Sequence, residues 1–267
     1  MSLRTTLLAV AFAASCAATP PAPAPVSPPS PSPPVPQAAN DSEALYRKME
    51  SALAKAKKLQ VEFQSSSDNT AIKGTFKVGE GNKFEMNIAG AAGQKKYTLV
   101  LTCDGTKMNL TRTETPPPPI PLQAQPELPA PGTLATNVLA ALARGGAWLA
   151  QDFSEGEYRA VANPYFEERQ KAAEEEHRPM KPLPPVAPRD VTALHELRNF
   201  RPGGAGAVTY DLVRKGDNPM LVATLTVTID PKSNLPTRRE GAFFLTGSEG
   251  KPGEAPLSKW SETYSFK

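Results

Sequence analysis

Residues 74–110 alternate apolar and polar side chains with a period of two. Turn sequences interrupt the alternation at residues 79–82 and at the Asp104-Gly105 pair. Because successive side chains of a strand point to opposite faces, this pattern predicts a β-meander with one apolar face. An Asp-Gly pair between two such runs is a strong hairpin signal, with both central residues expected at positive φ. An antiparallel sheet with one apolar face needs another element to cover that face.

The same period returns near the C-terminus. Together with a first strand that begins at residues 59–63, it predicts about ten strands. The C-terminal strands are expected at residues 191–200, 207–214, 221–229, 237–245 and 259–266. Residues 230–234, Asp-Pro-Lys-Ser-Asn, predict a turn from their composition alone.

Two segments have helical spacing. Residues 40–59 place Leu45, Met49 and Leu53 on one stripe, with Asn40 as the expected N-cap. This amphipathic helix directly precedes the sheet, so the two are expected to pack together. The cluster of Lys55, Lys57 and Lys58 is interpreted as a solvated helix end.

A second helix is expected after Thr133 and should end at Gly145-Gly146. It is apolar nearly all round, which favours a buried position. Residues 163–177 predict a separate, exposed helix that starts at the Asn163-Pro164 pair. Proline-rich stretches flank this region at residues 116–131 and 179–188, so we expect an insertion over about residues 115–190.

The N-terminus carries a targeting signal. Arg4 precedes an apolar run at residues 7–14, which is too short to span a bilayer and predicts a signal peptide at residues 1–15. The end Ala-Ala-Ser-Cys16 resembles a bacterial lipobox, which makes Cys16 the expected lipid attachment site. The alternative is ordinary signal cleavage with Cys16 as a bystander. Residues 16–39 are proline-rich and predict an extended tether, so we expect a lipid-anchored envelope protein on the periplasmic face of the outer membrane.

Composition excludes several classes of function. A net charge of +3 lacks the basic footprint of a nucleic-acid-binding protein. Only two cysteines are present; if Cys16 is acylated, Cys103 is left as a buried, inert thiol. Residues 174–177, Glu-Glu-Glu-His, do not have metal-ligand spacing, and the chain has two histidines in all. No nucleophile elbow or phosphate loop is found, so we expect no enzymatic activity, no metal and no cofactor.

Several strand-and-turn motifs resemble the lipoprotein-carrier superfamily (LolA, LolB and their relatives). They are the Leu45-Tyr46-x-x-Met49 helix start, the Cys103-Asp104-Gly105 turn, the Asp230-Pro231 turn and the 262–266 end, Glu-Thr-Tyr-Ser-Phe. The resemblance implies a mainly β (α+β) fold. Its curved antiparallel half-barrel sheet of about ten strands, covered by a few helices, would occupy residues 40–267. No catalytic residue is carried over.

The resemblance also implies a concave apolar groove that holds an acyl chain from a lipid or a lipoprotein. The groove would be lined by apolar-phase residues: Phe63, Phe76, Phe84, Met86, Leu99, Leu101, Leu225 and Val227. The candidate lid is the apolar helix expected after Thr133. Its residues that would cover the groove are Leu134, Val138, Leu139 and Leu142. The expected partners are a lipid or acyl chain and, through the N-terminal lipid, a membrane. Two alternatives stay open: the same residues can form an ordinary core, and the fold can serve as an envelope sensor or protein-interaction module.

Overall fold

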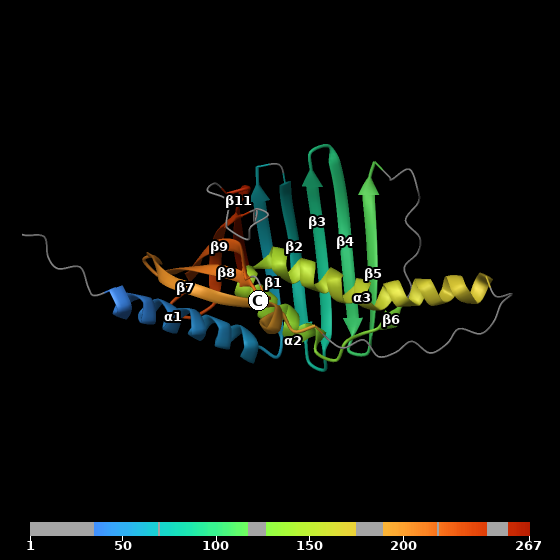
Figure 1. The fold of residues 1–267 in the computed structure, drawn as a ribbon, viewed down its shortest axis with the longest axis horizontal. Helices are drawn as coiled ribbons and strands as arrows, with labels where there is room; N and C mark the ends of the chain where they lie inside the picture. Colours follow the sequence, from blue (N-terminus) through green and yellow to red (C-terminus); the bar gives the residue numbers. More distant parts are fainter. Residues whose placement is uncertain (1–34, 69, 117–126, 175–188, 218, 245–255) are drawn as a thin grey trace, which may run out of the picture. The chain divides into compact units, whose positions relative to one another are not determined.

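One antiparallel sheet of 11 strands dominates the computed structural model (Figure 1). The structure describes residues 35–68, 70–116, 127–174, 189–217, 219–244 and 256–267. The predicted signal peptide, Cys16, most of the tether, His177 and parts of the insertion lie outside these residues. Within them, no helix is long and apolar enough to cross a membrane.

The strands follow the order β6-β5-β4-β3-β2-β1-β11-β10-β9-β8-β7. The sheet therefore ends at β6 and β7 and is not closed into a barrel. This open sheet confirms the fold class that the sequence predicted. The strand bounds are β1 Leu59–Ser67, β2 Thr70–Gly79, β3 Lys83–Ala92, β4 Lys95–Asp104, β5 Lys107–Thr115, β6 Leu128–Pro129, β7 His195–Gly204, β8 Ala207–Arg214, β9 Met220–Ile229, β10 Pro236–Phe243 and β11 Ser258–Phe266. Figure 1 shows β2 to β5 side by side, as the predicted meander requires.

Four helices are described: α1 Val35–Lys55, α2 Leu134–Gly145, α3 Ala147–Glu174 and α4 Val191–Leu194. Helix α1 packs against β7, β8 and α2, whereas α2 and α3 pack against each other. Helix α3 also contacts β5 and β6. The apolar phase of the strands and the apolar stripes of α1, α2 and α3 join in a single core cluster.

Three sequence-based predictions of where a helix or strand begins are wrong. Helix α1 begins at Val35, so Asn40 lies inside it and is no N-cap. Residues 191–194 form α4, capped by the Asp190 side chain, and the strand starts only at His195. The separate helix at residue 163 does not exist, because α3 is continuous and contains Pro164. Buried Val161 and Ala162 hold the helix against the core on the N-terminal side of that proline.

The apolar phase of the sheet is built from stacked aromatic rings. Phe63 and Phe76 lie 5.1 Å apart between ring centroids, and Phe76 and Phe84 lie 6.2 Å apart. Gly74 stands opposite Phe63 on β2, and a Cβ there would lie 2.9 Å from the Phe63 ring and closer to the Asn87 carbonyl. The ring occupies the space that a side chain would need, so the glycine is required by close packing.

Asn82 joins the β2–β3 turn to the start of α2. Its Oδ1 accepts a hydrogen bond from Ala135 N at 2.9 Å, and its Nδ2 donates to Pro131 O at 2.8 Å. Thr133, the expected N-cap, makes no side-chain capping bond. A residue distant in sequence therefore accepts the hydrogen bond of the Ala135 N–H group, which has no partner within the first turn of α2. In the next turn, only Gly105 of the Asp104-Gly105 pair has positive φ.

Asn82→Gly is expected to lower the free energy of unfolding by about 1–2 kcal/mol, because the side-chain cap of α2 is lost. Glycine tolerates the positive φ of 64° that Asn82 adopts, so the backbone strain does not change. Asn234→Gly is the matched control, since Asn234 has a φ of 55° and its side chain makes no hydrogen bond among the described contacts. Urea denaturation measures both variants; equal stability of the two would contradict the capping role.

Candidate functional site

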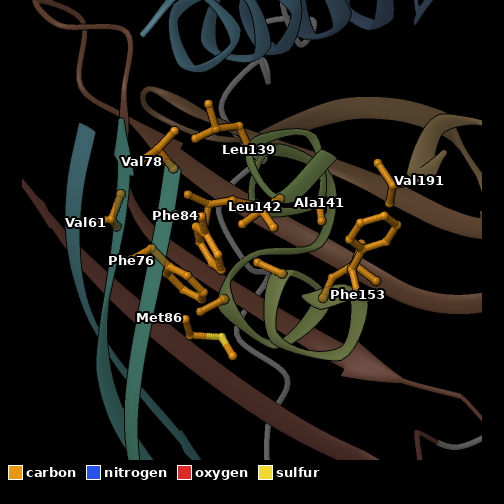
Figure 2. Packing of buried hydrophobic residues seen from close by; sticks show 14 of the residues in the cluster. Val61, Phe76, Val78, Phe84, Met86, Leu139, Ala141, Leu142, Phe153 and Val191 are labelled. Carbon is orange, nitrogen blue, oxygen red and sulfur yellow. The ribbon is translucent and has the colours of Figure 1, made fainter. Parts of the chain in front are cut away.

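All residues of the predicted groove and lid lie in one core. The eight groove residues are at most 4% exposed, and the four lid residues are at most 6% exposed. Figure 2 shows Phe76, Phe84 and Met86 of the sheet facing Leu142 of α2. The apolar face of the sheet is thus filled by the protein's own helices. Contact of these residues with a ligand stays a prediction.

Two buried side chains of opposite charge, Arg239 and Glu262, lie at the junction between α2 and α3, and the Tyr264 hydroxyl is hydrogen-bonded to both. Arg239 and Glu262 are directly opposite each other on β10 and β11 and are 0% and 1% exposed. The Arg239 guanidinium donates to Leu142 O and Ala143 O at the end of α2, both at 2.8 Å. Glu262 accepts from Ala147 N at 3.0 Å, at the start of α3. A cation thus binds a helix C-terminus and an anion binds a helix N-terminus, as the helix dipoles favour.

Three tyrosines complete this cluster, which we call the polar knot: Arg239, Glu262, Tyr46, Tyr210 and Tyr264. Tyr46 OH donates to Ala143 O at 2.9 Å, and Tyr210 OH donates to Arg144 O at 2.6 Å. Tyr264 OH donates to Glu262. The carbonyls of Leu142, Ala143 and Arg144 are therefore bound by side chains from α1 and the sheet, and the knot holds the C-terminal end of α2.

Burial sets the charge states in the knot. Desolvation opposes the charge of Arg239, but Tyr210, Tyr264 and Glu262 raise its pKa overall, so the guanidinium remains protonated. Desolvation raises the pKa of Glu262, an effect that Arg239 and the donors around the carboxylate oppose. Arg239 and Glu262 therefore each favour the charged form of the other.

A separate cleft lies between α1, α2 and the β2–β3 turn. Its volume is about 730 Å³. Apolar atoms of Ala54, Val78, Ala135, Leu139 and Ala140 contribute to its lining. Leu139 is thus the residue of the predicted lid that reaches a cavity, and Figure 2 shows it beside Val78.

The mouth of the cleft is charged. Lys55 and Lys57, at the end of α1, line it and are exposed. Neither lysine has an ion-pair partner among the described residues. Glu50, in contrast, is paired with Arg47 at 2.8 Å and with Arg144 at 3.4 Å. These unpaired lysines therefore line the cleft together with Glu80, an exposed carboxylate.

A larger hollow, of about 940 Å³, lies on the other face of the sheet. Its lining consists mainly of short side chains such as Ser66, Ala71, Ala89, Thr98, Thr113 and Thr263. Its apolar lining is about as extensive as that of the cleft beside α2, so apolar area alone does not distinguish the two. The cleft beside α2 is the candidate considered below because it reaches the core cluster at Leu139.

Residues considered for metal or thiol chemistry do not form a site in the described part of the chain. No group of three His, Cys, Asp or Glu residues lies close enough together there to hold a metal ion. Cys103 is buried, its thiol donates to Asn82 O at 3.3 Å, and burial raises its pKa. It has the properties of an inert thiol.

The sequence interpretation missed Arg239 and Glu262, although a signal existed. Each is a charged residue in the apolar phase of its strand: Arg239 lies two residues before Gly241, and Glu262 two residues after Trp260. Opposite charges at such positions on neighbouring strands indicate a buried pair, because an unpaired buried charge is very costly.

Comparisons with known proteins concern the fold alone. No protein-family model matches the chain, and no curated protein matches it. Two solved structures of MucB with MucA, one from Pseudomonas aeruginosa, have TM-scores of 0.31 and 0.30 and identities of 8% and 9%. They match 85% of this chain but only 57% and 56% of theirs, so this chain spans less than two thirds of their length. A DUF1329 family protein from Desulfovibrio piger has a TM-score of 0.27 and 11% identity, covering 86% of this chain and 92% of its own.

At these TM-scores and identities no function transfers from the neighbours. The function must be inferred from the residues of the chain itself.

Proposed function

We propose that this chain is a bacterial envelope protein that binds the acyl chain of a lipid or lipidated protein in the cleft between α1 and α2. Helix α2 is the lid of this proposal, and it would move while the polar knot holds its C-terminal end. The observation that carries the proposal is the position of Leu139, which lines the cleft and also belongs to the core cluster. A movement of α2 at this residue would extend the cleft towards Phe84 and Phe76 beneath it (Figure 2).

The size and chemistry of the cleft support an amphiphilic ligand. A volume of about 730 Å³ is typical of a small-molecule pocket. Each methylene removed from water contributes about 0.8 kcal/mol, so an acyl chain needs apolar lining and no special residue. Lys55 and Lys57 at the mouth suit a carboxylate or phosphate at the end of the chain. This arrangement matches a single-chain anionic amphiphile.

Membrane anchoring is part of the proposal. Acylation of Cys16 after removal of residues 1–15 would fix the protein to a membrane, and the proline-rich tether would hold the domain away from the surface. The support for this step is the lipobox-like sequence, since Cys16 lies outside the described residues.

We also propose that the protein binds without catalysing a reaction. His195 is the histidine that the structure describes, and desolvation, Arg214 and Arg144 lower its pKa. Its Nδ1 is buried and has no hydrogen-bond partner in the described part of the chain. Asp152 opposes this lowering of the pKa only in part, and no hydrogen bond from an acidic side chain to His195 is among the described contacts, so we propose no general acid–base role for it.

Filling the cleft should abolish acyl-chain binding. In a titration with a fluorescent sixteen-carbon fatty acid, Ala140→Trp is expected to weaken binding at least about tenfold, because displacing two methylenes costs more than 1.4 kcal/mol. Ala193→Trp on α4, an exposed position outside the cleft, is the matched control and should bind like the wild type. Equal weakening of both variants, or none, would contradict the cleft as the site.

The lysines at the mouth provide a second readout. The double substitution Lys55→Ser and Lys57→Ser should weaken binding of the fatty acid about two- to fivefold, as expected for exposed charges, and leave an uncharged monoacylglycerol unaffected. Lys95→Ser with Lys96→Ser, on β4 and outside the cleft, is the charge-matched control.

A second candidate function is an envelope protein-interaction module. The observation that favours it is the filled core, in which the polar knot holds the helix pair on the sheet. MucB is described in complex with MucA, a protein partner. The titration decides between the two candidates, because a wild-type protein that binds neither fatty acid nor monoacylglycerol contradicts acyl-chain binding and leaves the interaction module.

A further inference from the structure

The two edges of the sheet differ in how they are protected. Strand β6 pairs only with Lys107 and Met108 of β5. From Leu110 to Thr115, β5 has no strand partner on that side among the residues that the structure describes. An unprotected edge is a template for pairing with another strand.

The opposite edge, β7, carries several features that prevent pairing. Pro202 cannot donate a backbone hydrogen bond, and the register shifts between Arg198 and Arg201 and again between Pro202 and Gly204. Helix α1 packs against β7 and helix α3 contacts β5, so helix packing alone does not distinguish the two edges. The free part of β5 has no proline and no register shift. It therefore remains competent to pair.

The backbone groups that face this edge can be identified. Ala130 N donates to Thr106 O at 2.8 Å, so the carbonyl of an even-numbered residue points towards β6. Because backbone groups alternate sides along an antiparallel strand, those of Leu110, Arg112 and Glu114 point to the open edge. Arg112 and Glu114 therefore carry both the free hydrogen-bonding groups and the charges of this edge.

We propose that β5 pairs antiparallel with β5 of a second copy of this chain, with the two-fold axis at Thr113. The sequence Thr-Arg-Thr-Glu-Thr over residues 111–115 is self-complementary about that axis. Arg112 then stands opposite Glu114 of the partner subunit, and Glu114 opposite the partner's Arg112. The two-fold axis relates these two pairs to each other, so the same pair forms twice, as an isologous interface requires.

The side chains are already placed for this exchange. Arg112 Nε lies 2.8 Å from Glu114 Oε1 in the same chain, and both side chains are partly exposed. Pairing would bring four alternating charges together along one face of a continuous sheet, and opposite charges on facing strands favour pairing. Pro116, which has no N–H group, would end the paired stretch. The open edge of β5 is therefore complementary to the same edge of a second copy of the chain.

A charge exchange tests the proposal by sedimentation of the full chain at increasing protein concentration. The wild type should show a concentration-dependent dimer. Arg112→Glu places like charges opposite each other and should remain monomeric, as should Glu114→Arg. The double substitution should restore the dimer, because the charges are again complementary. A wild type that is monomeric at every concentration, or single variants that dimerise like it, would overturn the proposal.

A cysteine substitution provides a readout that does not alter these charges. At the axis, the two Thr113 residues form a non-hydrogen-bonded pair with Cα atoms about 4.5 Å apart, within disulfide range. Thr113→Cys should therefore form an intermolecular disulfide under mild oxidation. Thr102→Cys, exposed on β4, is the matched control and should form much less, as should the wild type. Equal cross-linking of Thr113→Cys and Thr102→Cys would also overturn the proposal.

Discussion

Arg239→Met is expected to lower the free energy of unfolding by about 3–5 kcal/mol, the cost of leaving a buried charge without its partner. Glu262 would remain 1% exposed beside its two amide donors but without the guanidinium opposite it. The carbonyls of Leu142 and Ala143 would each lose one donor at the same time, while Gly146 N and Tyr46 OH would still bind them. Urea denaturation measures the effect.

A double-mutant cycle separates the electrostatic coupling of Arg239 and Glu262 from the bonds to the helix ends. Glu262→Gln should also destabilise the protein, and the double variant should lose less than the sum of the two single losses, because neither charge is left alone. Arg238→Met, the neighbouring residue on β10, is exposed and should change stability by less than about 0.5 kcal/mol. A loss for Arg239→Met as small as that of Arg238→Met would show that the polar knot does not hold the helices.

Gly146→Ala is expected to destabilise the protein by about 3 kcal/mol or more, since backbone strain and steric overlap act together. Gly146 has a φ of 90°, which an alanine adopts only with strain. A Cβ there would also lie 2.7 Å from the Tyr264 hydroxyl and closer still to Glu262 Oε2. The residue connects α2 to α3, so the change would displace both helix ends from the knot.

Gly132→Ala is the matched control for this substitution. Nothing lies within 4 Å of a Cβ placed at Gly132, so the variant should unfold at nearly the wild-type temperature. Thermal denaturation compares the two variants. Equal melting temperatures would contradict the close packing at Gly146.

The sheet was predictable from the sequence because strand periodicity is local information. Strand β8 has the predicted bounds, and β9, β10 and β11 differ only at their ends. Helix α2 was also predicted correctly, since an apolar segment followed by Gly145-Gly146 defines it without tertiary information. The open form of the sheet agrees with the family resemblance.

Features that depend on distant residues were not predictable in the same way. The local sequence around Pro164 predicts a helix start. Buried residues on the N-terminal side of this proline nevertheless keep α3 continuous across it. Thr133 reads locally as an N-cap, but Asn82 from a distant turn provides the capping bond. The polar knot joins β10, β11, α1 and the α2–α3 junction. Its geometry exists only after the chain has folded.

Whether the groove would be open or filled also could not be decided from the sequence. The same apolar phase, which includes Phe76 and Leu101, serves equally for a ligand groove and for a core beneath helices. The structure shows the core arrangement. Our proposal therefore places the ligand in the cleft at the edge of that core. Leu139 lies between the cleft and the core.

Photo-cross-linking with a fatty acid that carries a diazirine at the end of its chain tests acyl-chain binding in the cleft most directly. Mass spectrometry of the labelled protein identifies the modified residues. Binding in the cleft predicts labels on α2 around Leu139 and Ala140 and on α1 around Ala54, and unlabelled palmitate should suppress them. Labels confined to the helix-free face of the sheet, or labels that palmitate does not suppress, would contradict it.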